Sequence, residues 1–425
     1  MLLDHTTKGV PPHAVAGRRA IGDMGWNLLQ EHFDLPACVL RRSAIENNLG
    51  WMQSLVNDQG ALFSPHGKTT MSPELFDMQL KAGAWAITLA TAHQVRVARA
   101  FGLKRIFYAN QLTGRPFIDF IIDALRTDDR FEFIFLVDDA QNVQDIERAA
   151  RAAGLAKGRL QVLVELGYPG GRCGCRSVDE ALALAARVVA SPVIDLIGIE
   201  GFEGYLHAPD EASLERKVRD FLQAMISLTR QCHDKGFFAP GQTLFSVGGS
   251  AFYDLVFNEA GTMGALPPGC KVLTRSGCYL THDAGMYRNF FEQIKRRNPE
   301  IGHRDKGLMD ALEIWGYVLS RPEPGRLIVN VGKRDLSPDE LPVAHTAVRF
   351  RSGDGSNRPE ALVGHQAVAL NDQHCHIECP ADSPLVPGDA VIFGASHPCL
   401  TFDKWRNIFL RDDDYNIVGA VSTWF

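Results

Sequence analysis

The sequence has no long hydrophobic run and no block of basic residues. A membrane-spanning helix needs roughly 18 consecutive apolar residues without charge, so we expect no membrane span. The first ten residues contain Asp4, His5 and Lys8 and no apolar core, so no secretory signal is expected either. The net charge is −6, and no cluster of lysine and arginine forms a phosphate-binding patch. These absences exclude membrane and nucleic-acid partners as the first interpretation.

Disulfide patterning is also lacking. The nine cysteines are an odd number spread over 425 residues, which does not resemble the framework of a small secreted protein. Reduced thiols in a cytoplasmic protein are the expectation. With 45% hydrophobic and 22% charged residues, the chain has the composition of a globular protein with a sizeable core, and its length suggests two or three domains.

The sequence contains no internal repeat, but its pattern is regular. Short apolar runs typical of strands alternate with segments of helical periodicity, and eight such units in succession predict a (β/α)8 TIM barrel. The predicted strands are Ala61–Ser64, Ala84–Leu89, Arg105–Ala109, Phe131–Val137, Gln161–Leu166, Asp195–Ile199, Thr243–Val247 and Lys271–Thr274.

Helix-start signals lie between these runs. Ser43-Ala-Ile-Glu46 and Ser177-Val-Asp-Glu180 have the spacing of capping boxes, in which the serine accepts from the helix and the acid reaches back. Ser72-Pro73-Glu74 places a capping residue, a first-turn proline and an acid in order. Each signal predicts a helix that begins directly after it.

The pattern changes near residue 280, where helical periodicity gives way to strands separated by Pro, Gly and Asp turns. We predict an N-terminal extension at 1–35, a barrel at 36–280 and a β-rich domain at 281–425, with 36–42 as a possible strand of the β-rich domain. The strands expected there are Leu312–Leu319, Arg326–Gly332, Thr346–Phe350, Ala361–Leu370, Ala390–Gly394, Asn407–Leu410 and Tyr415–Val421.

Lys68 follows the first predicted barrel strand, in Ser64-Pro-His-Gly-Lys-Thr69. Residues at the carboxyl ends of TIM-barrel strands face the active site, where a desolvated lysine amine becomes nucleophilic enough to form a Schiff base. Most loop lysines are merely solvated, and position alone favours that simpler interpretation.

A glycine turn, Val247-Gly-Gly-Ser250, follows the seventh predicted strand. Small residues let backbone N–H groups approach an anion, and the loops after strands seven and eight are the usual phosphate site of this fold. On its own such a turn is often an ordinary loop. Its position six strands after Lys68 favours phosphate binding.

Arg172 lies after the fifth predicted strand, where it is expected to point into the barrel mouth. Because a guanidinium keeps its protons, an arginine facing a pyridine nitrogen would leave that nitrogen unprotonated. The commoner alternative is an ion pair with Glu165 or Asp179.

His397-Pro-Cys399 is the best metal motif, because an imidazole and a thiolate together suit zinc. Two ligands do not complete a site, so water, substrate or another residue must supply the rest, and a purely structural role is the alternative. Cys173-Gly-Cys175 and His374-Cys-His376 are rival metal candidates.

Together these motifs resemble the fold-type III pyridoxal-phosphate (PLP) enzymes with the alanine-racemase-like fold, and within them the D-serine dehydratase and D-threonine aldolase group. Besides the lysine and glycine motifs, the segment Thr274-Arg-Ser-Gly-Cys-Tyr279 resembles the strand-eight segment that touches the cofactor. Pro387-Gly-Asp389 through His397-Pro-Cys399 resembles the C-terminal metal motif. The matches run in order along nearly the whole chain.

The resemblance implies a role for each matching residue. Lys68 would bind PLP as a Schiff base, Arg172 would face the pyridine nitrogen, and His397 and Cys399 would bind a divalent metal, expected to be zinc. The family is typically a homodimer. The full set of implied cofactor contacts is Lys68, His66, Arg172, Tyr205, Gly248, Gly249, Ser250 and Tyr279.

Two departures bear on substrate choice. Thr70 stands where the family often has histidine, and Tyr168-Pro-Gly170 lengthens the strand-five motif. The first thirty residues and Met286–Arg304 match the family poorly.

The expected reaction is metal-assisted dehydration of D-serine to pyruvate and ammonia, with Lys68 as the base at the substrate Cα. The same parts could instead cleave D-threonine to glycine and acetaldehyde. A thiolate ligand favours zinc and, with it, dehydration. Further alternatives are an amino-acid racemase using Tyr287 or Tyr317 as a second base, a non-catalytic PLP carrier, and a metal-dependent TIM-barrel hydrolase without PLP.

Overall fold

The structure is a computed structural model that describes residues 6–10, 21–350 and 357–425. The chain forms two compact units, each continued by more than one stretch of sequence. The barrel unit contains Gln53–Lys68 and Met78–Gly277, and the β-rich unit contains the described parts of Met1–Met52, Thr69–Asp77 and Cys278–Phe425. Within the described residues, no helix is long and apolar enough to cross a membrane.

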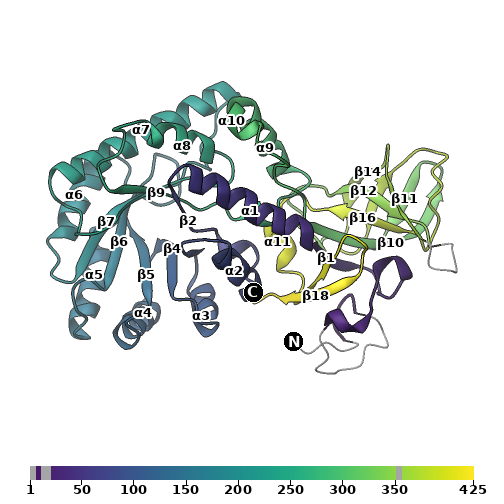
Figure 1. The fold of residues 1–425 in the computed structure, drawn as a ribbon, viewed down its shortest axis with the longest axis horizontal. Helices are drawn as coiled ribbons and strands as arrows, with labels where there is room; N and C mark the ends of the chain where they lie inside the picture. Colours follow the sequence, from purple (N-terminus) through teal and green to yellow (C-terminus); the bar gives the residue numbers. More distant parts are fainter. Residues whose placement is uncertain (1–5, 11–20, 351–356) are drawn as a thin grey trace. The chain divides into compact units, whose positions relative to one another are not determined.

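The barrel unit is built on eight parallel strands in the order β2-β9-β8-β7-β6-β5-β4-β3 (Figure 1). The first and last strands also meet, because the Trp85 amide donates to the Phe63 carbonyl at 2.7 Å and the Thr88 amide donates to the Pro65 carbonyl at 2.9 Å. The strands are β2 Leu62–Phe63, β3 Ile87–Leu89, β4 Arg105–Gln111, β5 Glu132–Val137, β6 Leu160–Leu166, β7 Ile194–Gly201, β8 Thr243–Ser246 and β9 Cys270–Thr274. All eight predicted barrel strands are therefore confirmed.

The helices of this unit lie along the outside of the strands (Figure 1). Four of them, α3, α5, α6 and α7, start at capping residues, because the side chains of Thr91, Asp139, Ser177 and Asp210 each accept a bond from a first-turn amide. The helices are α3 Ala92–Ala100, α4 Arg115–Thr127, α5 Ala140–Ala152, α6 Val178–Val189, α7 Glu211–Asp234 and α8 Tyr253–Gly261.

One predicted cap is wrong. Helix α1 (Arg42–Asp58) begins one residue before Ser43, so Ser43 lies inside the helix. Its hydroxyl donates to Asp413 at 2.7 Å, and Glu46 pairs with Arg42 at 2.8 Å. The capping-box spacing is present, but both side chains have other partners. Helix α2 (Pro73–Lys81) does begin at the predicted proline.

The interior of the barrel is a packed core rather than a channel. Side chains from most strands meet there, and burying them supplies the main driving force for closing the sheet. The cluster contains Phe107, Ile134, Leu136, Leu163, Ile197, Leu244 and Leu273. The chemistry-bearing side chains are consequently confined to the strand ends.

The β-rich unit is built around one mixed sheet in the order β13-β12-β16-β10-β1-β17-β18, with β11, β14 and β15 joined to it through β10. Strand β1 (Ala37–Arg41) runs antiparallel to β10 and parallel to β17. The remaining strands are β10 Leu312–Glu323, β11 Arg326–Val329, β12 Val343–Val348, β13 Pro359–Ala361, β14 Gln366–Leu370, β15 Cys375–Glu378, β16 Ala390–Gly394, β17 Asn407–Arg411 and β18 Ile417–Ser422.

Some details of this unit differ from the sequence prediction, which also did not include strand β15 (Cys375–Glu378). The single strand expected at Ala361–Leu370 is interrupted by Gly364, whose positive φ of 70° turns the chain and separates β13 from β14. The segment expected to match the family poorly contains helix α9 (Met286–Arg297) and the short α10 (Pro299–Gly302).

Candidate functional site

The polar residues of the barrel unit gather where its parallel strands end. His66 and Lys68 follow β2, and Glu165 and Glu200 are the last residues but one of β6 and β7. In a barrel of parallel strands these carboxyl ends open on one face, which is where such folds place their chemistry. Lys68 lies in the one-turn helix η3 (Gly67–Thr69) and is exposed, in contrast to the buried Pro65 and Gly67.

His66 is held tightly by the backbone around it. A side chain at Gly277 would come within 2.7 Å of the His66 carbonyl, so only glycine fits that position. Burial, then the charges of Lys68 and Arg275, lower the pKa of His66 well below its usual value. Its buried Nδ1 has no hydrogen-bond partner among the described residues. His66 is therefore a neutral imidazole with a ring nitrogen open to a ligand.

Arg275, at the end of β9, is the main buried cation of this face. It is only 6% exposed and forms an ion pair with the buried Glu200. Its guanidinium also donates to Ser246 Oγ at 3.0 Å and to the Gly201 carbonyl at 3.2 Å. Arg275 lies in the segment Thr274–Tyr279, which resembles the family's strand-eight segment, but no role for Arg275 was predicted from sequence. Its place directly after a predicted strand was the available signal.

Glu165 lies in the same group of buried acids. Burial, followed by the nearby charge of Glu200, raises its pKa to about 8, although a hydrogen bond from Gln111 opposes the shift. The carboxyl is therefore largely protonated at neutral pH. A shift of this size on a strand-end acid is typical of functional sites, although structural charge clusters also produce such shifts.

The glycine turn after β8 forms a cradle of backbone donors. The amides of Gly249 and Gly248 donate to the Glu203 carboxylate at 2.8 and 3.3 Å. Gly248 has a φ of 98°, which favours glycine. The two amides thus already hold an anionic group, so the turn has the donor geometry that a phosphate requires. Thr274 adds a buried hydroxyl without a partner among the described residues.

Arg172 and Tyr205 lie together outside this buried group. The guanidinium carbon of Arg172 is 4.6 Å from the Tyr205 ring centre and 4.7 Å from that of Phe202. Both Arg172 and Tyr205 are exposed. The two predicted residues are thus in contact as a cation–π pair, and the ion pair of Arg172 with Glu165 or Asp179 is not formed.

In the β-rich unit, three potential ligands converge. One donor atom each from Cys278, His397 and Cys399 lies within 4.8 Å of the other two. His397 Nδ1 is 2.6 Å from the Asp339 carboxylate, which leaves Nε2 as the ligand atom. His397 adopts a φ of 96°, unusual for histidine, and its amide donates to Asp283 at 3.1 Å. A side chain held in such a conformation is typical of functional sites.

The two thiols of this group lie within hydrogen-bonding distance, with their sulfurs 3.7 Å apart and either able to donate. The hydrogen bond with Cys278, supported by His397, lowers the pKa of Cys399. The same hydrogen bond, together with burial, raises the pKa of Cys278. Cys399 therefore loses its proton more readily than Cys278, and Thr69 Oγ1 lies 3.3 Å from the Cys399 sulfur. Thr69 is the residue that follows Lys68 in the sequence.

Comparison with known proteins shows to which family the chain belongs. The family described as "Alanine racemase, N-terminal domain" matches residues 40–253, just over half of the chain. The chain belongs to this family of fold-type III PLP enzymes. A second family, described as "Putative serine dehydratase domain", matches residues 311–411 in the β-rich unit.

Relatives of this fold-type III enzyme are lyases. A D-threonine aldolase from Arthrobacter sp. is 24% identical over 399 residues, which covers 92% of each chain. The crystal structure of D-threonine aldolase from Filomicrobium marinum has a TM-score of 0.73 and 21% identity, covering 96% of this chain and 98% of that one.

D-threo-3-hydroxyaspartate dehydratase from Delftia sp. HT23 is also similar, with a TM-score of 0.70 and 20% identity over 94% of this chain and 99% of that one. Solved variants of the Delftia enzyme replace a histidine and a cysteine two positions apart, and the cysteine variant is described as metal-free.

The remaining predicted residues of the fold-type III enzyme are placed as follows. Tyr279 is buried in the one-turn helix η4 (Cys278–Leu280) of the β-rich unit. Ser250 lies in the turn that follows Gly249 and is partly exposed. Cys278 is the residue that the sequence argument missed. It lay inside a quoted motif, but its closeness to Cys399 arises only from folding.

The rival metal motifs do not come together as the sequence pairs them. Cys173 forms a second group of three potential ligands with Asp138 and Glu165, whose donor atoms lie within 4.8 Å of one another, but Cys175 is not part of that group. Cys375 is buried in β15, and His376 Nε2 is 2.7 Å from Asn371. Among the residues that the structure describes, no group of three potential ligands contains His374 or His376.

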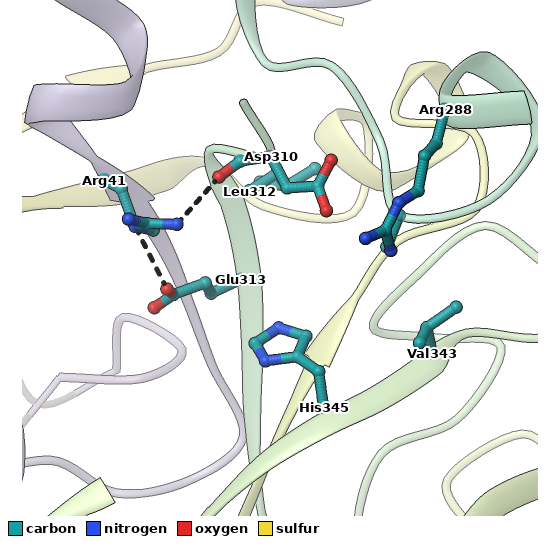
Figure 2. A pocket seen from close by; sticks show the side chains of 8 residues that line it. Arg41, Arg288, Asp310, Leu312, Glu313, Val343 and His345 are labelled. Carbon is teal, nitrogen blue, oxygen red and sulfur yellow. Dashed lines mark hydrogen bonds and ion pairs between the residues drawn. The ribbon is translucent and has the colours of Figure 1, made fainter. Parts of the chain in front are cut away.

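A charged pocket of about 220 Å³ lies elsewhere in the β-rich unit (Figure 2). The Arg41 guanidinium lies 3.7 Å from Glu313 and 3.3 Å from the Asp310 carbonyl, and Arg288 stands across the pocket. Burial raises the pKa of the Asp310 carboxyl to about 6, although Arg288 opposes the shift. Glu313 also receives two bonds from Arg411 at 2.6 and 3.0 Å, so this part of the pocket is a buried charge network.

Proposed function

We propose that this fold-type III enzyme is a PLP-dependent, metal-assisted D-serine dehydratase, which converts D-serine to pyruvate and ammonia. The observation that carries the proposal is the convergence of Cys278, His397 and Cys399 on one point in the β-rich unit. Sulfur and imidazole donors suit zinc, a Lewis acid able to bind a substrate hydroxyl and make it a better leaving group.

The donor groups of the barrel unit fit PLP. Lys68 would hold the cofactor covalently, and the amides of Gly248 and Gly249, with Ser250, would hold its phosphate. Glu203 now accepts from these amides and would have to release them. The partnerless Nδ1 of His66 and hydroxyl of Thr274 are further buried atoms that a ligand would satisfy.

Two arginines are candidates for the pyridine nitrogen. Arg172 is the residue that the resemblance implies, and Arg275 is a second candidate because it is buried at the end of a barrel strand. Either guanidinium would keep the nitrogen unprotonated, since arginine does not give up its proton. Such an environment weakens the cofactor as an electron acceptor and increases the value of metal assistance.

The chain's own residues divide the remaining work. When bound, PLP supplies the electron sink for the carbanion at the substrate Cα. Lys68 Nζ would take the Cα proton as general base. His397 and Cys399 would hold the metal, whose Lewis acidity would make the β-hydroxyl a better leaving group, and that hydroxyl would leave as water with the proton that Lys68 has taken. Hydrolysis of the dehydrated product returns that water and releases pyruvate and ammonia.

D-threonine aldolase activity is the second candidate. It is supported by the two relatives named D-threonine aldolase, each of which matches more than nine-tenths of this chain. Here a base would remove the proton of the β-hydroxyl, and the Cα–Cβ bond would break to give glycine and acetaldehyde. Of the two tyrosines considered for a racemase, the Tyr317 hydroxyl lies 3.4 Å from the Phe33 carbonyl and 3.5 Å from Glu31, and the Tyr287 ring centre lies 6.0 Å from that of His397.

A homodimeric state and a cytoplasmic location complete the proposal, the first on the basis of the family resemblance and the second on the odd, scattered cysteine count. The size of the purified protein in solution would test the first, and fractionation of the host cell would test the second. A monomeric protein at the concentrations used in activity assays would contradict the proposed homodimer.

The deciding experiment measures pyruvate, glycine and acetaldehyde after adding D-serine or D-threonine to PLP-loaded protein, with and without a chelator. Pyruvate from D-serine that disappears with chelator supports the dehydratase. Acetaldehyde and glycine from D-threonine, with no pyruvate from D-serine, would transfer the proposal to the aldolase. Lys68→Ala should abolish either activity, whereas the exposed Lys235→Ala is the matched control.

A further inference from the structure

Cys278 is a buried thiol next to the proposed metal ligands. It lies in η4, only 4% exposed, and its sulfur is 3.7 Å from that of Cys399. The two residues are 121 positions apart in sequence, so the contact is a product of the fold. Of the nine cysteines, only this pair belongs to the group containing His397.

The sulfur separation fits a shared metal. Two thiolates bound to one zinc at about 2.3 Å in tetrahedral geometry have sulfurs about 3.8 Å apart. A thiol–thiolate hydrogen bond has a similar length, so the distance alone does not distinguish a hydrogen bond from a shared metal. The shared metal is favoured by a third potential ligand, His397, whose Nδ1 is hydrogen-bonded to Asp339 and whose Nε2 is left for coordination.

The surroundings are those of a built site. Asp283 accepts hydrogen bonds from the backbone amides of His397 at 3.1 Å, Gly285 at 2.9 Å and Tyr287 at 2.9 Å, which fixes the His397 backbone. The Thr69 hydroxyl, 3.3 Å from the Cys399 sulfur and 3.8 Å from that of Cys278, can donate to a thiolate. Such second contacts orient ligands and moderate the charge on sulfur.

We propose that Cys278 is the third protein ligand of the metal, which makes the site a Cys2His zinc centre with one open position. The inference rests on the proposed function, in which that position binds the substrate hydroxyl. Binding forms a metal–Sγ bond at Cys278 and breaks its S–H bond, and the proton goes to solvent. No oxidation or reduction is involved. Three soft donors select zinc over magnesium or manganese.

The first test counts thiolates spectroscopically in the full-length, PLP-loaded protein kept reduced. Metal is removed with a chelator and replaced by cobalt, and the sulfur-to-cobalt absorption in the near ultraviolet is compared between variants. Cys278→Ser and Cys399→Ser should each lose about half of the wild-type intensity. Cys270→Ser, which removes a partly buried thiol of the barrel unit, should lose none.

The second test measures zinc affinity by competition with a chromophoric chelator. Loss of outer-sphere partners typically weakens metal binding 10- to 100-fold, so loss of a ligand in Cys278→Ser should weaken zinc binding by at least about 100-fold.

Unchanged cobalt absorption and zinc affinity in Cys278→Ser, with loss in Cys399→Ser, would overturn the third-ligand inference and leave the proposed metal-assisted lyase intact. Failure of wild-type protein to bind cobalt or zinc at all would instead remove the metal from the proposed function.

Discussion

The ion pair between Arg275 and Glu200 gives a quantitative prediction about the barrel unit. Arg275→Met removes the pair and the bonds to Ser246 Oγ and the Gly201 carbonyl. Glu200, only 2% exposed, would be left without a counter-ion, and one of its oxygens already has no partner among the described residues. Breaking a buried pair in this way costs about 3 to 5 kcal/mol of unfolding free energy.

The loss of unfolding free energy should depend on pH in Arg275→Met but not in Glu200→Leu. Burial already raises the pKa of Glu200, so in Arg275→Met the carboxyl can take up a proton and the loss should be smaller at pH 5 than at pH 8. In Glu200→Leu the remaining guanidinium cannot lose its proton, so the loss should be nearly the same at both pH values.

Urea unfolding of the cofactor-free protein, followed by circular dichroism, measures these losses. The double variant Arg275→Met/Glu200→Leu should lose much less than the sum of the single losses, with a coupling energy of about 2 to 4 kcal/mol. Additive losses, or single losses below about 1 kcal/mol, would refute the view that the two side chains form one buried charge pair.

Three further predictions concern the β-rich unit and the metal. Asp310→Asn should raise the unfolding free energy at pH 7.5 by about 2 to 3 kcal/mol. The pKa of Asp310 is about 6 in the folded state, above its unfolded value, so the native state loses stability relative to the unfolded state as pH rises from about 4 to 6. Asparagine does not ionise and avoids this loss. The gain should shrink at pH 4.5 in urea titrations, and an equal gain at both pH values would contradict the assignment. Glu313→Ala should cost about 3 to 5 kcal/mol, since it leaves the buried Arg411 without its partner, and an unchanged midpoint of urea unfolding would contradict this. Chelator treatment should abolish pyruvate formation without removing PLP absorbance, and added zinc should restore it. Full activity after verified metal removal would exclude metal assistance.

The barrel was predictable because its signals are local. Apolar runs such as Phe131–Val137 predict buried parallel strands. Because the carboxyl ends of parallel barrel strands open on one face, Lys68 and the glycine turn are then expected on the same face. The division between a barrel and a β-rich region was also visible, since the turn-forming residues change near residue 280.

The features that sequence missed depend on long-range contacts. Cys278 meets Cys399 across 121 residues, and no local pattern distinguishes it from a structural cysteine. Similarly, the carboxylate of Glu203 fills the amide cradle of Gly249, although the two are 46 residues apart. Ser43 does not cap helix α1, because its hydroxyl donates a hydrogen bond to Asp413, which is 370 positions away in sequence.

The most direct test of the central claim is to locate the covalently held cofactor. Purified protein would be incubated with PLP, reduced with borohydride, digested and examined by peptide mass spectrometry. We predict a phosphopyridoxyl addition on the peptide containing Lys68, and none on that peptide in Lys68→Ala. An addition confined to other lysines, or no addition with full retention of lyase activity, would contradict the assignment of Lys68 as the PLP lysine.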